Sequence, residues 1–144
     1  MKKRIFGTVL IANLVLMACF TLLVSAVSAQ NKPVREPDIY FVPTPHDVVE
    51  VMRRLADVKK NDVVYDLGCG DGRIVIAAAK MAGAKAYGFD IDPVMVAKSK
   101  ENVKKEGVEK LVTIRGKDIF ELDLRPASVV TLYLLPELNV RLVP

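Results

Sequence analysis

From about residue 40 onward, short apolar runs alternate with longer amphipathic stretches, and this alternation predicts strands and helices in turn. Four runs have the length and the β-branched content of buried parallel strands: 63–65, 85–92, 111–115 and 128–135. The last run is apolar almost throughout and predicts a fully buried strand. Two helices are predicted, over 73–82 and 93–106, and a glycine follows each of them, as is typical of a helix end. Strands joined through helices in this order predict an α/β fold with a parallel, doubly wound sheet.

A further helix is predicted before the first strand. Thr44, Pro45 and Asp47 have the spacing of an N-cap, a first helical residue and the acid of a capping box. Apolar side chains then recur on one helical face, which we expect to pack on the sheet; they are Val48, Val51, Met52 and Leu55. The single histidine, His46, falls in the first turn, where a solvated side chain is expected.

Between the first strand and the helix that follows it, Asp66 precedes three alternating glycines, Gly68, Gly70 and Gly72. Glycine has no Cβ, tolerates positive φ and lets a ligand lie against bare backbone. The helix N-terminus presents unpaired N–H groups and a partial positive charge, so the turn has the form of a nucleotide-binding loop. A dinucleotide-binding motif would have a third glycine where this chain has Arg73, so the spacing departs from that motif.

The spacing Asp-x-Gly-x-Gly-x-Gly resembles the first motif of the class I S-adenosylmethionine-dependent methyltransferases, and the likeness runs from about Tyr40 to the C-terminus. Segments 41–52, 66–79 and 129–139 also resemble bacterial members related to the mitochondrial lysine N-methyltransferases that act on the ATP synthase c subunit. This resemblance implies a Rossmann-like sheet, S-adenosylmethionine as cofactor, and methylation of a protein lysine or another amine. A non-catalytic donor-binding module is the alternative. A nicotinamide-dependent oxidoreductase is a third hypothesis, which Arg73 disfavours.

The same resemblance implies which residues hold the methyl donor. Asp90 ends the second strand, where a carboxylate accepts from both ribose hydroxyls. Asp118 and Ile119 follow the third strand at the position that contacts adenine, although a loop aspartate can also satisfy its own backbone. With the glycine loop and the entrance, the expected donor-binding residues are Asp66, Gly68, Cys69, Gly70, Gly72, Asp90, Asp118, Ile119 and Thr44. Asp92, followed by Pro93, is expected to be the N-cap of the next helix.

The end of the fourth strand is where the methyl group and its acceptor are expected to meet. Tyr133 and Glu137 are the candidate catalytic residues, either as a base or as polar groups that position an amine. Many amine-methylating relatives have Asp/Asn-Pro-Pro-Tyr/Phe here, whereas this chain has the sequence Tyr-Leu-Leu-Pro over 133–136, which leaves the acceptor atom open. The alternatives are a tyrosine ring in the core and a glutamate that interacts with a helix dipole.

The chain stops at Pro144, eight residues after Pro136, whereas a complete class I sheet has seven strands. The sequence therefore predicts an incomplete sheet of about four strands in a C-terminally truncated domain. The fourth strand, central in a complete sheet, is then expected to form an exposed apolar edge.

The N-terminus has the composition of a targeting segment. Three basic residues precede 27 uncharged residues over 5–31, and 27–29 has the small residues of a signal-peptidase site. We expect 1–29 to be a signal peptide or, through residues 5–29, a membrane anchor, 30–39 to be a linker, and 40–144 to be the S-adenosylmethionine-binding methyltransferase domain. The basic N-terminus places the domain across the membrane, which conflicts with a methyl donor that is made in the cytosol.

The charge and the cysteine content bear on which partners and metal sites the sequence indicates. The net charge is +4, but Lys2, Lys3 and Arg4 supply three of these charges, so the rest is close to +1 and no nucleic-acid partner is indicated. Cys19 lies in the leader and Cys69 in the glycine loop, so the domain can form no internal disulfide and its sequence has no metal-ligand cluster. Cys69 is expected to face the ligand pocket as a small residue.

Overall fold

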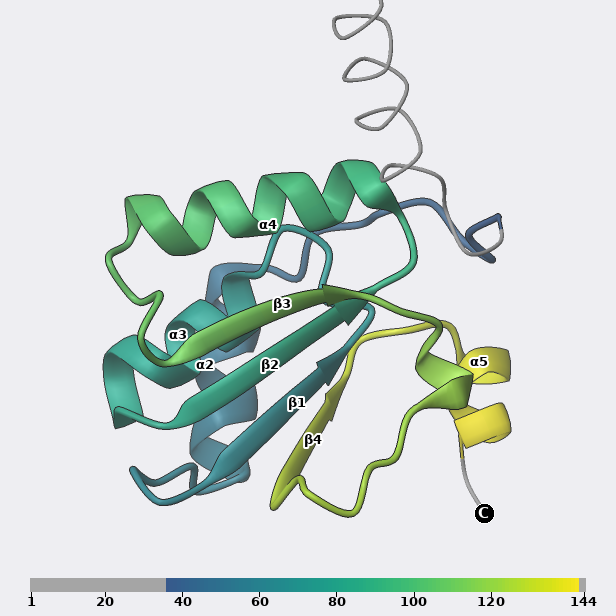
Figure 1. The fold of residues 1–144 in the computed structure, drawn as a ribbon. Coiled ribbons are helices and arrows are strands. Elements are labelled where there is room, and N and C mark those ends of the chain that lie inside the picture. The colour runs from purple at the N-terminus through teal and green to yellow at the C-terminus, as the bar shows by residue number, and fades with distance from the viewer. Residues whose placement is uncertain (1–35, 143–144) are drawn as a thin grey trace, which may run out of the picture. The chain divides into compact units, whose positions relative to one another are not determined.

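Four parallel strands form the centre of the structure, a computed structural model that describes residues 36–142 (Figure 1). In chain order they are β1 (Val63–Leu67), β2 (Lys85–Asp90), β3 (Val112–Gly116) and β4 (Val129–Leu132). Their order across the sheet is β3-β2-β1-β4, so β1 pairs with β2 on one side and with β4 on the other. The strand order reverses at β1, and such a switch point is where ligands bind at the carboxyl ends of parallel strands.

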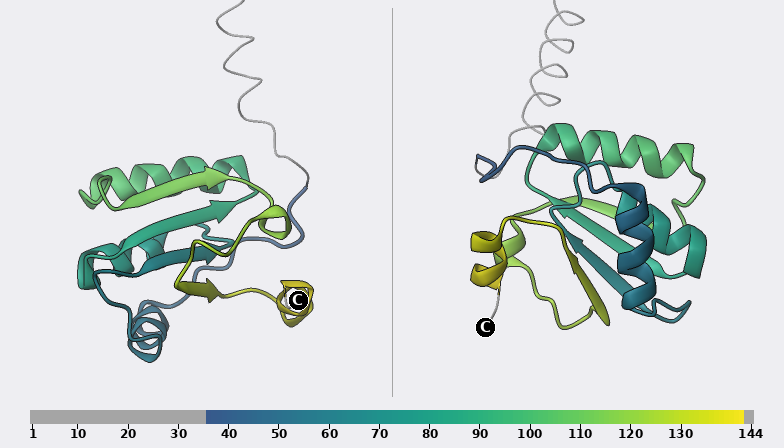
Figure 2. Two further views of the ribbon diagram at one scale, coloured as in Figure 1. Left: turned by 60° about the horizontal axis from the view of Figure 1, so that its bottom comes forward. Right: turned by 180° about the vertical axis from the view of Figure 1, so that it is seen from behind.

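Helices cover one face of the sheet, as the view from behind shows (Figure 2). α3 (Arg73–Ala82) follows β1 and α4 (Pro93–Lys105) follows β2. Both pack on the strands through a buried apolar core that includes Val75, Ile76 and Val103. α2 (His46–Leu55) packs against α3. The predicted strand-helix alternation and the parallel α/β sheet are therefore confirmed.

The ends of α3 and α4 follow the local sequence signals. Gly83 adopts the left-handed conformation at the C-cap of α3, with φ of 68°. The Asp92 side chain caps α4 by accepting a hydrogen bond from the Val94 N–H at 2.8 Å, and Pro93 is the first helical residue. These caps are made by residues adjacent in sequence, so the sequence was sufficient to predict them.

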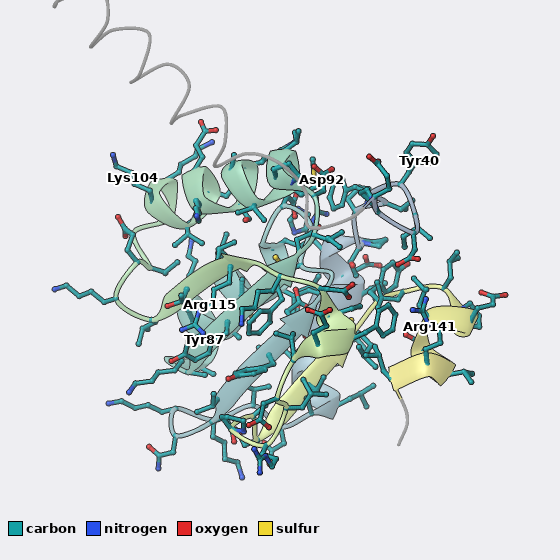
Figure 3. The ribbon with its side chains drawn as sticks, turned by 45° about the vertical axis from the view of Figure 1, so that its right-hand side comes forward. Tyr40, Tyr87, Asp92, Lys104, Arg115 and Arg141 are labelled. Atoms are coloured by element: carbon teal, nitrogen blue, oxygen red, sulfur yellow. The ribbon has the colours of Figure 1, made fainter. Side chains whose placement is uncertain are left out.

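The opposite face of the sheet is closed by shorter elements. The 3₁₀ turn η1 (Ile119–Glu121) and the loop after it pack over an aromatic cluster on β1 and β2. In this cluster the ring centroids of Tyr65 and Tyr87 are 5.3 Å apart, and those of Tyr65 and Phe89 are 5.0 Å apart. Arg115 of β3 lies over the Tyr87 ring (Figure 3), with its guanidinium carbon 5.5 Å from the ring centroid.

The start of α2 differs from the predicted capping box. The helix begins at His46, Pro45 occupies the N-cap position, and no side chain caps the helix. Thr44 is buried instead, and its carbonyl accepts a hydrogen bond from Arg73. The prediction that Thr44 is the N-cap is therefore wrong, because a long-range contact fixes the chain one residue before the N-cap, Pro45.

The buried face of α2 also differs from the prediction. Val49 is the buried residue of this helix, whereas Val51 is exposed and Leu55 is 82% exposed. The helix packs mainly on α3, so a different set of side chains is covered.

β4 is an edge strand in the part of the chain that the structure describes, as the strand count predicts. It pairs with β1, and the strand is not fully buried: Val130 is 39% exposed, while Thr131 is buried. The predicted strand over 128–135 shortens to Val129–Leu132, and α5 (Pro136–Leu142) begins soon after it.

The predicted leader over 1–29 and most of the predicted linker lie outside the described residues. Among residues 36–142, no helix combines the length and the apolar character needed to cross a membrane.

Candidate active site

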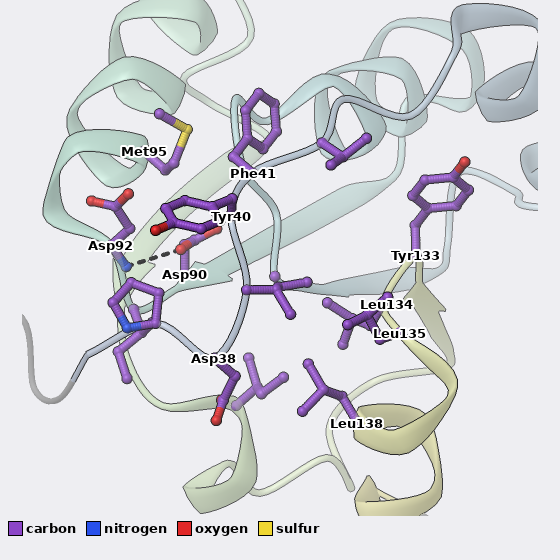
Figure 4. A pocket seen from close by; sticks show the side chains of 16 residues that line it. Asp38, Tyr40, Phe41, Asp90, Asp92, Met95, Tyr133, Leu134, Leu135 and Leu138 are labelled. Carbon is purple, nitrogen blue, oxygen red and sulfur yellow. Dashed lines mark hydrogen bonds between the residues drawn. The ribbon is translucent and has the colours of Figure 1, made fainter.

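A cavity of about 700 Å³ opens at the carboxyl ends of β1, β2 and β4 (Figure 4). Residues 37–42, which precede α2, line one part of it, and residues 133–135 after β4 line another. Gly68 at the end of β1 and residues 90–92 at the end of β2 lie between them, beside Met95 of α4 and Ile119 of η1. This volume is within the range of small-molecule pockets.

Two of the loop glycines have distinct and separate roles. Gly68 (φ 78°) is exposed and lines the cavity, and a Cβ added there would approach the Leu134 side chain to 2.8 Å. Gly72 (φ 83°) is the N-cap residue of α3, and a Cβ there would come 3.1 Å from the Ser99 Cβ of α4. Gly68 therefore presents backbone to the cavity, whereas Gly72 allows two helices to pack closely.

The middle glycine is covered by an aromatic ring. Gly70 has φ of 52° and is buried, and a Cβ added there would overlap the Phe41 ring. The space in front of Gly70 that the sequence assigns to a ligand is thus occupied by Phe41. The N–H of Gly70 points elsewhere, because it donates to Asp90 Oδ2 at 2.8 Å.

Asp90 lies at the end of β2 and lines the cavity. Its second oxygen, Oδ1, accepts from the Asp92 N–H at 2.9 Å, so both carboxylate oxygens accept from backbone N–H groups. Burial, which outweighs these hydrogen bonds, raises the pKa of Asp90 above its usual range. Each oxygen of an ionised carboxylate has a further lone pair, so Asp90 can still accept from two vicinal hydroxyl groups.

Asp66 is buried behind the loop at the end of β1. The Thr131 hydroxyl donates to Asp66 Oδ1 at 2.7 Å, whereas the buried Oδ2 has no hydrogen-bond partner in the described structure. Burial is the main cause that raises the pKa of Asp66 to about 7. Asp66 is not among the residues that line the cavity, so its expected contact with the donor stays a prediction.

The two residues expected to contact adenine differ in their position relative to the cavity. Ile119 lines the cavity. Asp118 is buried next to it and caps η1, since its Oδ1 accepts from the Phe120 N–H at 3.0 Å. This hydrogen bond fits the alternative interpretation of Asp118, in which a loop aspartate satisfies its own backbone.

Cys69 and Thr44 are both buried and are not among the residues that line the cavity. The Cys69 side chain packs in the core under β2, where its Sγ lies 2.8 Å from the position of a Cβ on Gly88. Burial raises the pKa of this thiol well above its ordinary value. Cys69 follows Gly68 in a loop that turns toward the sheet, so adjacent residues face opposite sides.

Of the two candidate catalytic residues, the structure brings only Tyr133 to the cavity. Tyr133 is 46% exposed and lines the wall that follows β4 (Figure 4). Glu137 is exposed on α5 and does not line the cavity, because Leu138 is the α5 residue that faces it. The alternative interpretation of Glu137, a first-turn helix residue, fits this position.

Several lining residues were not found by sequence reasoning. Tyr40 and Phe41 precede α2, and Met95 lies on α4. Tyr40 and Asp90 both line the cavity (Figure 4). A cluster of two aromatic residues just before a helix start is a weak signal that could have identified Tyr40 and Phe41. Met95 carries no such signal, since its position depends on how α4 packs.

The residues at the cavity fit an adenosyl ligand. Asp90 offers acceptor positions for a ribose, Gly68 offers bare backbone, and apolar side chains flank both. Among the described residues, no group of three or more His, Cys, Asp or Glu could hold a metal ion.

The comparisons with known proteins all identify methyltransferases. The ANTKMT methyltransferase domain matches residues 66–144. A protein-lysine N-methyltransferase of Saccharolobus islandicus is 43% identical over 109 residues, which cover 75% of this chain and 68% of that protein. A ribosomal protein L11 methyltransferase of Caldanaerobacter subterraneus is 31% identical over 111 residues, or 76% of this chain and 36% of that protein.

A solved structure extends the comparison to the cofactor. The chain is 56% identical to an RNA methyltransferase from Salinibacter ruber in complex with S-adenosyl-L-homocysteine, with a TM-score of 0.67. The match covers 68% of this chain and 64% of that one. The chain thus spans about two thirds of two of these relatives and about a third of the L11 methyltransferase.

Proposed function

The chain belongs to the ANTKMT methyltransferase domain family, within the class I S-adenosylmethionine-dependent methyltransferases, and we propose that it methylates the side-chain amine of a lysine in a protein. The relatives support S-adenosylmethionine as the cofactor, because the Salinibacter protein holds S-adenosyl-L-homocysteine. The choice of acceptor rests on the cavity itself.

The charge of the cavity lining is the observation that carries this proposal. Asp38, Asp90 and Asp92 line the cavity, and no lysine or arginine is among its lining residues in the described chain. With Asp90 assigned to the ribose, Asp38 and Asp92 are the carboxylates left to face an acceptor. An opposite charge attracts a cationic lysine side chain, whereas the phosphates of RNA would be repelled. The remaining lining is largely apolar, which suits the aliphatic stem of lysine.

RNA methylation is the second candidate, because the Salinibacter relative is named as an RNA methyltransferase and is 56% identical. This activity would require a basic surface close to the cavity, since RNA binding depends on neutralising phosphates. The acidic lining argues against it.

In the proposed reaction the cofactor supplies a methyl group already activated by a positively charged sulfur. The neutral amine of the acceptor attacks the methyl carbon, the new N–C bond forms as the C–S bond breaks, and its electron pair stays on sulfur. A lysine first loses a proton to water, and we propose that the Tyr133 phenol oxygen then accepts a hydrogen bond from the neutral amine and positions it at the cavity. Geometry supplies most of the acceleration, because alignment of the three atoms avoids an entropy loss of about 7–11 kcal/mol.

The acceptor can be identified by labelling. The full chain in mild detergent is incubated with a bacterial lysate and S-adenosylmethionine that carries a tritiated methyl group. Label that protease releases but ribonuclease does not, followed by methyl-lysine detection by mass spectrometry, supports the proposal. Label that only ribonuclease releases would favour RNA methylation. Binding of S-adenosylmethionine without any transfer would favour the non-catalytic donor-binding module.

We also propose that residues 1–29 direct export or anchor the chain in a membrane. The support is compositional: an uncharged stretch over 5–31 follows three basic residues. Cell fractionation and sequencing of the mature N-terminus test this. A new N-terminus at Gln30 indicates cleavage of a signal peptide, an intact N-terminus in the membrane fraction indicates an anchor, and an intact soluble chain contradicts both.

A further inference from the structure

Arg73 lies one residue after the last loop glycine, and its guanidinium makes contacts with two separate segments. Its Nε donates to Asp71 Oδ1 at 2.9 Å and its Nη2 donates to Asp71 Oδ2 at 2.6 Å. Its Nη1 donates to the backbone carbonyl of Thr44 at 2.7 Å. The side chain is only 21% exposed, so these charged hydrogen bonds are largely shielded from water.

The partner of Arg73 is itself held in place. The Asn102 side chain of α4 donates to the Asp71 carbonyl at 2.9 Å, which links this loop residue to a packed helix. Burial alone would raise the pKa of Asp71, but the hydrogen bonds and the charge of Arg73 outweigh it and hold the pKa below its usual range. Asp71 therefore stays ionised at neutral pH and orients the guanidinium toward Thr44.

The segment that Thr44 ends is part of the cavity wall. We call residues 37–44 the strap: residues 37–42 line the cavity, and the Phe41 ring covers Gly70. At the other end of the strap, Asp38 lies 3.8 Å from the Arg141 guanidinium, and both side chains are partly exposed. An exposed pair at this distance contributes little, whereas a shielded charged hydrogen bond contributes more. The strap is thus held at Thr44 by a shielded charged hydrogen bond.

From this arrangement we propose that Arg73 is a positioning residue for cofactor binding, because it holds the strap over the cavity at Thr44 and thereby keeps Phe41 on Gly70. The strap opens to admit the cofactor. The proposal rests on the proposed function only in taking S-adenosylmethionine or its product as the ligand. It does not depend on the identity of the acceptor.

The first test compares Arg73→Gln with the wild type in the full chain, by titration and stopped-flow binding of S-adenosyl-L-homocysteine. We expect Kd to rise about tenfold or more, mainly through faster dissociation, because the strap opens more often. Arg125→Gln is a matched control: Arg125 makes the same two-bond contact with the residue two positions before it, Asp123, on an exposed loop. It should leave Kd unchanged. An unchanged Kd for Arg73→Gln would overturn the proposal.

A double-mutant cycle separates positioning from a general loss of structure. Phe41→Ala removes the ring from Gly70 without touching the Arg73 contacts. If Arg73 acts through the strap, both substitutions disturb the same contact of Phe41 with Gly70. The Kd of the double variant should then be no higher than the higher of the two single-variant Kd values. Effects that multiply would show that Arg73 acts independently of Phe41 and would contradict the proposal.

Hydrogen exchange gives a measurement that needs no ligand. In the free protein, Arg73→Gln should increase exchange in peptides that cover 38–44 and leave β1 and β2 protected, while Arg125→Gln should change neither. If the wild type binds no S-adenosyl compound, the proposed function fails, but this exchange result still decides whether Arg73 holds the strap. Unchanged exchange over 38–44 in Arg73→Gln would refute that role.

Discussion

Replacing Asp66 with asparagine would show whether one buried carboxyl group controls the pH dependence of folding. Asp66 is 2% exposed, and the Thr131 hydroxyl donates to one of its oxygens at 2.7 Å. Burial, which outweighs this hydrogen bond, raises the pKa of Asp66 from 3.8 to about 7. The nearby charges of Asp90 and Asp71 act in the same direction.

The sign and the size of the effect follow from the two pKa values. Between about pH 4 and pH 7, the folded chain keeps a proton on Asp66 that the unfolded chain has released, so the free energy of unfolding falls as the pH rises. Each tenfold change in proton affinity is worth about 1.4 kcal/mol, so the full loss is roughly 4 kcal/mol at most. Above the folded pKa of about 7 both states are ionised, and the dependence ends.

Urea unfolding of the full chain at about pH 5, 6, 7 and 8 measures this slope. Asp66→Asn keeps an acceptor for Thr131 and cannot ionise, so its stability should change much less with pH. A residual slope of the same sign is expected from Asp90, whose pKa burial also raises. The absolute stability of the variant is not the readout, because an unpaired amide adds a cost that does not vary with pH.

Asp62→Asn is the control for this measurement. Hydrogen bonds from the Lys59 N–H and from Ser128 lower the pKa of Asp62, so its contribution to stability is present above the unfolded pKa of 3.8 and is lost only below it. The control should keep the wild-type slope from pH 5 to pH 8. Equal slopes for the wild type and Asp66→Asn would refute the assignment of this slope to Asp66.

Three further substitutions examine the cavity. Asp90→Ala should weaken binding of S-adenosylmethionine by about tenfold or more in titration, since it removes the acceptors for two hydroxyls. Its control, Asp92→Ala, should lower stability through loss of a helix cap and leave the affinity unchanged. Equal affinities for the two variants would contradict the ribose assignment. Gly70→Val should lower the melting temperature as well as the affinity, because its Cβ overlaps Phe41 at a positive φ, and an unchanged melting temperature would contradict this packing. Tyr133→Phe should lower kcat about tenfold or more and leave the Kd of S-adenosylmethionine unchanged, and a change in Kd alone would rule out a role in transfer.

The parts of the fold that sequence predicted well depend on neighbouring residues. Gly83 ends α3 and Asp92 caps α4 through contacts within a few residues, so the sequence contains the whole signal. The parallel order of the strands follows similarly from their alternation with helices. Gly68 and Asp90 reach the cavity because parallel strands end at the same edge of the sheet.

The predictions that failed depend on contacts between distant segments. Thr44 was assigned as a helix cap, but Arg73, 29 residues away, binds its carbonyl, and any residue type supplies a carbonyl. Cys69 was assigned to the pocket, but the turn directs it under Gly88. In the same way, Leu55 has the helical spacing of a core residue, yet it is exposed because α2 packs on another helix. Periodicity predicts which residues share a face, but not which element covers that face.

The distribution of tyrosines gives the protein two separate spectroscopic reporters. The chain has four tyrosines and no tryptophan. Tyr65 and Tyr87 lie with their rings 5.3 Å apart in the cluster on β1 and β2, whereas Tyr40 and Tyr133 line the cavity and are 96% and 46% exposed. Ultraviolet absorbance and fluorescence should therefore change in two distinguishable ways, since loss of the sheet alters the first pair and a bound ligand shields the second. A single sample can thus report folding and occupancy at the same time, without an added probe.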